Sequence, residues 1–403
     1  MPQSLSGLRV LDLSRLVPGP FCSLILADLG AEVIRVESHL VGDHLRLTAP
    51  RLGGESCYFL SLNRNKKSLA VNLKRSEGRE VFLKLASTAD VIIEGFRPGQ
   101  AESLGIGYTQ VKATNPGIVF CSLSGYGQEG PFRDRPGHDL NYVALAGLLD
   151  LFGSASGGAF VPPLQIADLA GALFAAVGIL SALVARGTTG EGGYVDSSLF
   201  HSAFSLLSFS AASHMSPQTP KENGQRYLMG SYPCYHLYAT KDGRYMSVAA
   251  LEPVFWADFC RAVEREDWIA KQFAVGADCA EVIAEVEQVF ATRTRAEWAA
   301  FFRDRAVACE PVNTLEEALS GPPVLHHGLV DVDHPTAGRL VQIGSPFPDG
   351  GPRPTASPPP LLGQHTVEIL RSLGYDECAI QQLRARRIVS AAEDVTAARK
   401  GRG

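Results

Sequence analysis

Three ionisable side chains stand where predicted helices begin, and their types could transfer protons. His138 lies in Gly137-His138-Asp139, between a loop rich in Gly, Pro and Arg and the segment NYVALAGLL. Asp168 precedes a long apolar segment, and Glu252 follows the apolar stretch YMSVAAL. Imidazole and carboxylate groups are the usual general acids and bases of enzymes. The same positions also suit helix caps or first-turn acids, so both roles stay open on the residues alone.

A group of basic side chains lies near one predicted strand and the helix that follows it. Its members are Arg64, Lys66, Lys67, Lys74 and Arg79, with Arg97 further along in Gly95-Phe96-Arg97-Pro98-Gly99. Parallel α/β sheets bind ligands at the ends of their strands, so these residues could form a phosphate or nucleotide pocket. A solvated surface is the alternative interpretation of such a group.

The first predicted strand-to-helix turn lacks the glycine fingerprint of dinucleotide-binding proteins. That kind of pyrophosphate site needs G-x-G-x-x-G, whose backbone N–H groups face the phosphates. Here the turn reads LVPGPF over residues 16–21, and each proline removes a donor. Glu37, at the end of the second predicted strand, is therefore not expected to bind a ribose.

The elements that must position these residues alternate between strands and helices. Residues 8–13 and 31–37 are apolar runs typical of buried strands, and residues 19–29 between them fit a helix. The alternation continues through SLAVNL, a helix over 76–86, DVIIEGF and GIVFCSLSGYG. This pattern predicts an α/β fold with a mostly parallel sheet covered by helices.

The pattern changes after about residue 200, which predicts a second domain. We expect a large domain over 1–200, a linker over 201–230 and a small α+β domain over 231–330. The small domain should hold two strands joined at Lys241-Asp242-Gly243, then helices near 253–263, 280–291 and 295–305, the first with Pro253 at its first position. Residues 331–360, rich in Pro and Gly from 345, predict an extended return linker. A helical part over 361–390 and a disordered tail over 391–403 would follow.

Composition limits the partners of the chain. It has 403 residues, 45% of them hydrophobic and 20% charged, which is enough to bury two cores. A formal net charge of −5 and a pI near 6.1 give no general attraction for nucleic acid or an anionic membrane surface. We therefore expect neither partner, and any bound anion should be held by a local pocket.

The cysteines and the chain ends bear on the compartment. The eight cysteines are scattered, without a C-x-x-C pair or a Cys/His cluster of zinc spacing, so we expect reduced thiols and no metal site. The first residues lack the features of a signal peptide. The apolar stretch 169–184 is shorter than the roughly 20 residues of a membrane span, which favours a buried helix. These features predict a cytoplasmic protein.

Five stretches together resemble the family III CoA-transferases, the CaiB/BaiF superfamily. They are LSGLRVLDLSRLVPGPFCSLILADLGAEVIRVE, LNRNKKSLAVNLKRSEGREVFLKLASTADVIIEGFRPG, GYGQEGPFRDRPGHDLNYVALAGLL, IADLAGALFAAVGILSALVARGTTGEGGYVDSSL and YATKDGRYMSVAALEP. The resemblance implies a Rossmann-like large domain built from both chain ends, a smaller α+β domain and an interlocked homodimer. It also implies an acyl-CoA substrate, with no cofactor beyond coenzyme A carried as the substrate thioester.

The resemblance also assigns roles to individual residues. Asp168 matches the nucleophile of the transferases and one of two proton-transfer groups in the α-methylacyl-CoA racemases. His138 matches the second group of the racemases, and Glu252 matches a glutamate beside that pair. The positions that would bind coenzyme A are Val71, Asn72, Leu73, Lys74, Gly95, Arg97, Asp139 and Tyr142.

Two departures from the family pattern affect these assignments. Asp168 is followed by Leu169-Ala170-Gly171, as in many transferases. Two arginines that are frequent in the family are replaced by Ser38 and Ser103, which leaves more of the coenzyme A binding to Lys74 and Arg97. The presence of His138, Asp168 and Glu252 together predicts a racemase acting at the α-carbon of a 2-methyl-branched acyl-CoA. The alternative is transfer of CoA between carboxylic acids through an Asp168 anhydride and thioester.

Overall fold

The protein is described by a computed structural model covering residues 3–153, 158–215, 228–347 and 356–395. Contacts within the chain divide it into two compact units. The first unit comprises Met1–Ser208 and Pro323–Gly403, so both ends of the chain contribute to it, and the second comprises Phe209–Pro322. Each unit is described by itself.

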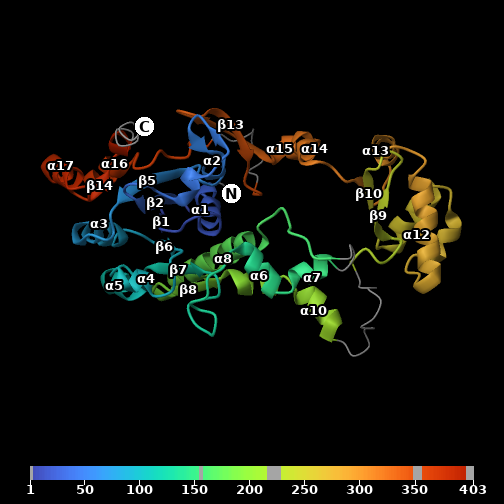
Figure 1. Ribbon diagram of the computed structural model, residues 1–403, viewed down its shortest axis with the longest axis horizontal. Coiled ribbons are helices and arrows are strands. Elements are labelled where there is room, and N and C mark those ends of the chain that lie inside the picture. The colour runs from blue at the N-terminus through green and yellow to red at the C-terminus, as the bar shows by residue number, and fades with distance from the viewer. Residues whose placement is uncertain (1–2, 154–157, 216–227, 348–355, 396–403) are drawn as a thin grey trace. The chain divides into compact units, whose positions relative to one another are not determined.

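The first unit is built on a seven-stranded sheet with the order β14-β5-β2-β1-β6-β7-β8 (Figure 1). Six strands are parallel, and the short β14 pairs antiparallel with β5 at one edge. The strands are β1 (Arg9–Asp12), β2 (Glu32–Ser38), β5 (Lys66–Val71), β6 (Val91–Glu94), β7 (Val119–Ser124), β8 (Tyr194–Ser198) and β14 (Val389–Ser390). The α/β fold with a mostly parallel sheet is thus confirmed.

Helices cover both faces of this sheet, because successive strand residues point to opposite sides. Val10 packs with α1 (Pro18–Asp28), α6 (Asp139–Leu145), α8 (Ile166–Thr189) and α9 (Leu199–Ser205). Its neighbour Leu11 packs on the other side with α3 (Ser76–Ala86), α4 (Gln100–Ser103), α5 (Tyr108–Thr114), α16 (Thr366–Ser372) and α17 (Glu377–Ala385). The remaining helices of this unit are η1 (His44–Leu47), α2 (Cys57–Leu62), α7 (Leu148–Gly153) and α15 (Pro322–His327), whereas all of α10 (Ser208–Met215) after Ser208 belongs to the second unit.

Helix α8 is long and apolar enough to cross a membrane by length and composition. It packs, however, against β7, β8, α1 and α9, as the core helix of a globular unit does (Figure 1). Its 24 residues extend the predicted segment by several residues at each end.

Three segments for which no regular structure was predicted contain ordered structure in their described parts. Within the expected linker 201–230, α9 and α10 continue to Met215. The expected extended segment 331–360 begins with a hairpin of β12 (Leu329–His334) and β13 (Gly338–Ile343), whose alternating apolar side chains pack on Leu60. In the expected disordered tail, Glu393 and Asp394 form ion pairs with Arg384 of α17. Residues 216–227, 348–355 and 396–403 lie outside the described residues.

The second unit combines a three-stranded antiparallel sheet with helices. Strands β9 (Tyr235–Ala239), β10 (Tyr245–Ala249) and β11 (Cys309–Pro311) pair in the order β11-β10-β9. The turn between β9 and β10 includes Gly243, whose φ of +70° suits glycine. The helices are α11 (Pro253–Ala262), η2 (Glu266–Lys271), α12 (Gly276–Phe290), α13 (Arg295–Phe302) and α14 (Leu315–Ser320).

A small antiparallel pair, β3 (Arg51–Leu52) and β4 (Glu55–Ser56), belongs to the first unit.

Candidate active site

The carboxyl edge of the large sheet gathers most of the residues that the sequence singled out. The chain passes from β1 through β2 to β5 on one side, and from β6 through β7 to β8 on the other. The strand order therefore reverses between β1 and β6, and open α/β sheets bind ligands at such a point, beyond the carboxyl ends of the strands. The turns after β5 and β6, which carry Lys74 and Arg97, both lie at this edge.

The turn after β5 presents Lys74 to solvent. Val71 is the buried last residue of the strand, and the Asn72 side-chain oxygen accepts the Lys74 N–H at 3.1 Å. Leu73 is half-buried and packs on the core beneath α3. The Lys74 side chain is exposed, and within the described residues it forms no ion pair. Its charge is thus available to an anionic ligand.

The turn after β6 is fixed by a buried carboxylate. Glu94 accepts the backbone N–H of Phe96 at 2.7 Å, and burial raises the pKa of Glu94 to about 7. The guanidinium of Arg15, from the turn after β1, lies 5.5 Å from the centre of the Phe96 ring and so joins the two turns. Gly95 and Arg97 are exposed, and Arg97 has no ion-pair partner in the described part of the chain.

The other four residues of the basic group named in the sequence analysis bind to other parts of the protein. Arg64 pairs with Asp28, and Lys67 pairs with Glu32 and Glu368. The Lys66 ammonium is fully buried and donates to Pro20 O, Ser23 Oγ and Asn63 Oδ1, and burial lowers its pKa to about 7. Arg79 donates to the backbone oxygen of Lys74 at 3.2 Å. Four of the six side chains thus already have partners within the protein, which leaves Lys74 and Arg97 as the members of this group that are open to an anionic ligand.

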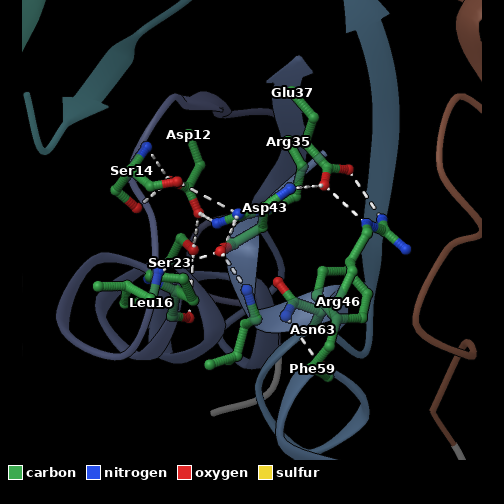
Figure 2. A network of polar contacts seen from close by, with 12 residues as sticks. Asp12, Ser14, Leu16, Ser23, Arg35, Glu37, Asp43, Arg46, Phe59 and Asn63 are labelled. Carbon is green, nitrogen blue, oxygen red and sulfur yellow. Dashed lines mark hydrogen bonds and ion pairs between the residues drawn. The ribbon is translucent and has the colours of Figure 1, made fainter. Parts of the chain in front are cut away.

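A buried ionic network, which sequence reasoning missed, holds the turn after β1 (Figure 2). Arg35 is 1% exposed and donates to Asp12 at 2.8 Å and to Asp43 at 2.6 Å. Asp12 also accepts the N–H of Ser14, and Asp43 accepts the N–H of Leu16 at 3.2 Å. Leu16 has a φ of +62°, a conformation that costs energy for a branched side chain. The network thus fixes a strained turn at the point where the strand order reverses.

Glu37 belongs to the same buried region and is fully engaged by the protein. Both of its oxygens accept from the Arg46 guanidinium at 2.8 Å, and the Asp43 backbone N–H donates to it as well (Figure 2). Ser68 Oγ is a further donor to Glu37. Arg46 holds the pKa of Glu37 at about 2, against the opposing effect of burial. The prediction that Glu37 does not bind a ribose agrees with this arrangement, since no lone pair is left facing solvent.

The motif Gly137-His138-Asp139 forms the start of α6. His138 occupies the position before the first helical residue, and its side chain is exposed. The backbone N–H of His138 donates to the Asn141 side-chain oxygen at 3.0 Å. The Tyr142 hydroxyl donates to the backbone oxygen of Gly137 at 2.6 Å. Burial, with smaller contributions from nearby anionic groups, raises the pKa of Tyr142 to about 12. The segment is therefore a compact turn held by its own polar groups.

Asp168 lies in the first turn of α8, beside this segment. Its backbone N–H donates to Asp139 Oδ1 at 3.0 Å, and α6 packs on α8. The residue before the helix is Gln165, so the interpretation of Asp168 as the cap itself is wrong. Burial raises the pKa of Asp168 to about 7, and the Asp139 carboxylate contributes to the rise. Such a carboxyl group can both give and accept a proton near neutral pH.

Glu252 belongs to the second unit. It stands immediately before α11, with Pro253 at the first helical position as the sequence predicted. Its side chain is exposed and makes no capping hydrogen bond. The structure thus brings Asp139, Tyr142 and Asp168 together with the His138 turn, whereas the approach of Glu252 to them remains a prediction.

A family model for CoA-transferase family III matches residues 5–366 of the chain. The chain belongs to this family. Among curated relatives, succinyl-CoA:glutarate CoA-transferase of Homo sapiens is 36% identical over 390 residues, covering 94% of this chain and 88% of that protein. Alpha-methylacyl-CoA racemase of Mus musculus is also 36% identical, over 389 residues, covering 96% and 97%. This family III chain is therefore similar to enzymes of both reaction types.

Solved structures show the same fold. The crystal structure of a CAIB/BAIF family protein from Brucella suis is 27% identical, has a TM-score of 0.79, and covers 93% of this chain and 100% of that chain. Within the described residues, no group of three or more His, Cys, Asp or Glu side chains is placed to hold a metal ion.

Proposed function

We propose that this family III enzyme is an acyl-CoA racemase that moves a proton at the α-carbon of a 2-methyl-branched acyl-CoA thioester. The observation that carries the proposal is the state of Asp168. Burial and the neighbouring Asp139 carboxylate bring its pKa to about 7, while the preceding turn presents His138 to solvent. A group that titrates near the working pH is well matched to proton transfer. A nucleophile, in contrast, must be deprotonated to attack a thioester.

The reaction is a 1,1-proton transfer with no net change in composition. One of the two groups, in its basic form, removes the α-proton, and the electron pair of the C–H bond moves into the thioester to give an enolate. The other group, in its acid form, then returns a proton to the opposite face of the same carbon. Asp168 and His138 exchange these duties with the configuration of the substrate, and Glu252 is proposed to lie near the pair.

The thioester would be held through its coenzyme A part at the carboxyl edge of the sheet. Lys74 and Arg97 are exposed cations without ion-pair partners in the described chain, which suits them to the phosphates. Val71, Asn72, Leu73 and Gly95 would supply the walls and backbone contacts of the same site. Asp139 and Tyr142 would lie next to the reacting end. Proton transfer of this kind needs no oxidant and no cofactor other than the coenzyme A of the substrate.

One N–H group that could have stabilised the enolate oxygen is already occupied. Backbone N–H groups at the start of α8 are natural candidates to bind this oxygen. The N–H of Asp168 donates to Asp139 instead. Donors for the enolate must therefore come from other groups than the Asp168 amide.

CoA transfer is the second candidate, and specific observations favour it too. The residues after Asp168 are Leu169-Ala170-Gly171, as in many transferases, and a succinyl-CoA:glutarate CoA-transferase is as similar to this chain as a racemase. In that reaction the Asp168 carboxylate would attack the thioester carbonyl and CoA thiolate would leave, which gives a mixed anhydride. The CoA thiolate would then attack the Asp168 carbonyl of this anhydride, releasing the first acid as its carboxylate and forming an Asp168 thioester.

Incubation with a 2-methyl-branched acyl-CoA in heavy water separates the two candidates. The racemase proposal requires deuterium at the α-carbon together with loss of optical purity. Transfer requires exchange of CoA into an added free acid such as succinate or glutarate, without α-deuteration. Thioester exchange alone would refute the racemase proposal.

We further propose that the enzyme is a cytoplasmic homodimer that binds neither membranes nor nucleic acid. All eight cysteines are free thiols, which suits a reducing compartment. Helix α8 leaves Leu173, Phe174, Val177 and Val184 between 45% and 75% exposed, an apolar face that a second copy would cover. Light scattering should give twice the chain mass of 43.2 kDa, and a Val177→Glu variant should dissociate more readily. A folded monomer at micromolar concentration would contradict the homodimer.

A further inference from the structure

The first turn of α8 is capped by a side chain from another helix. Gln165, the residue before α8, makes no side-chain hydrogen bond to the exposed N–H groups of the turn. The Asp139 carboxylate takes this role, accepting the N–H of Asp168 at 3.0 Å. Asp139 is the first residue of α6 and follows His138 directly. One hydrogen bond therefore ties the backbone of one proposed proton-transfer residue to the neighbour of the other.

We propose that Asp139 is a positioning residue. Its carboxylate fixes the His138 turn against Asp168, and its negative charge favours the protonated form of Asp168. This inference deepens the proposed racemase function and rests on it. Asp139 would act through Asp168 and His138 rather than on the reacting carbon.

The His138 turn is rigid enough to transmit this contact. The Tyr142 hydroxyl donates to Gly137 O at 2.6 Å, and the His138 N–H donates to Asn141 at 3.0 Å. The Tyr142 ring also fills the space beside Gly137, where a Cβ would come within 2.8 Å of a ring carbon. These contacts hold Gly137, His138 and Asp139 in one compact turn, and the bond from Asp168 to Asp139 ties that turn to α8.

The charges around Asp168 leave Asp139 as its main electrostatic neighbour. The titratable groups of the α6 segment nearest this point are Asp139 and Tyr142, with Tyr126 packed on the Tyr142 ring at 5.1 Å between ring centres, whereas the His138 side chain is exposed. The Tyr142 hydroxyl is occupied by Gly137 and does not donate to either carboxylate. No Lys or Arg in the described chain pairs with Asp139 or Asp168. Repulsion between the two carboxylates therefore adds to burial in favouring the protonated form of Asp168.

Two substitutions separate the roles of hydrogen bond and charge. Asp139→Asn retains an oxygen that can accept the Asp168 N–H but removes the charge, and Asp139→Ala removes both. Asp134→Asn is the matched control, because this carboxylate lies in the preceding loop and its side chain is 79% exposed. Thermal unfolding of each variant establishes that it is folded.

The first readout is the pH dependence of α-deuteration. Asp139→Asn should displace the limb that reports Asp168 to lower pH by about one unit, the scale of losing a neighbouring charge. Asp139→Ala should in addition lower kcat at least roughly tenfold at every pH, with a smaller change in KM, because the two groups lose their alignment. Asp134→Asn should follow the wild-type profile. A wild-type profile in both Asp139 variants would overturn the proposal.

The second readout does not depend on activity. The carboxyl carbon of Asp168 can be titrated by ¹³C NMR in aspartate-labelled protein, with Asp168→Asn for assignment. Asp139→Asn should lower the pKa of Asp168 even if the protein proves to be a CoA-transferase. An unchanged titration would refute the role of Asp139, whereas absent α-deuteration in the wild type would refute the racemase function alone.

Discussion

Arg35 and Asp43 form an ion pair of 2.6 Å that is sealed from solvent beneath the turn after β1. The same Asp43 side chain accepts the N–H of Leu16, so the pair holds a residue of positive φ in place. Because this turn lies where the strand order reverses, the buried charges preorganise the edge at which the thioester is proposed to bind. The contacts that Asp12 and Asp43 both make with Arg35 offset part of the cost of burying these charges.

Replacing Arg35 by Met should therefore destabilise the protein strongly. The substitution keeps most of the side-chain volume but leaves the buried Asp43 carboxylate without its cation, which typically costs about 3 to 5 kcal/mol. Denaturant unfolding at neutral pH measures the change. Arg371→Met, which removes an exposed ion pair with Glu377, is the control and should cost less than about 1 kcal/mol. A variant of Arg35 as stable as the control would show that the network does not hold the turn.

Acid should destabilise the fold through the same network. Arg46 holds the pKa of Glu37 at about 2, below its ordinary value of 4.5, and Arg35 and Lys66 hold that of Asp12 at about 2 against burial. The unfolded chain therefore binds more protons, so this stability is fully present above about pH 4.5 and is lost as the pH falls towards 2. Glu37→Gln should reduce the slope of the unfolding free energy by up to about 1.4 kcal/mol per pH unit in that window. Asp134→Asn should keep the wild-type slope.

The sequence predicted most of the sheet because its strands are continuous apolar runs. The helix 76–86 has the predicted bounds, and Pro253 begins α11 as expected. The hairpin of β12 and β13 was missed because the proline-rich segment after it dominated the composition of the region. Its alternation of Val330 and Val332 with polar residues was the available signal.

The candidate site was predictable only where a short motif carries it. Asp168 and the His138 motif stand out in the sequence, and Lys74 and Arg97 follow strands. Arg35 does not stand out, because a charged residue inside AEVIRVE resembles an outward-facing position of a strand. Its partners come from other elements, and only the fold brings them within bonding distance. The hydrogen bond from Asp168 to Asp139 spans 29 positions of the chain and has no local signal for the same reason.

Coenzyme A binding should depend on Lys74 and Arg97. Alanine at either position removes a charge-assisted contact to phosphate and should weaken binding of free CoA by about 1 to 3 kcal/mol. Isothermal calorimetry measures this directly. Lys67→Ala is a matched control from β5, the strand that precedes Lys74, and should bind CoA as the wild type does, because Lys67 is engaged by Glu32 and Glu368. Unchanged affinity in both test variants would place the phosphates elsewhere.

The roles of His138 and Asp168 decide between the two reactions. In a two-base racemase, alanine at either position should lower α-proton exchange by roughly 10²- to 10⁴-fold, the usual contribution of a positioned acid or base. In a transferase, loss of Asp168 should abolish activity while His138 is dispensable. Mass spectrometry after incubation with acyl-CoA and hydroxylamine tests this independently of rates. The racemase should show no modification of the peptide that carries Asp168, and Asp168→Asn provides the blank. A hydroxamate on that peptide would establish an acyl or thioester intermediate, and the enzyme would then have to be assigned to CoA transfer.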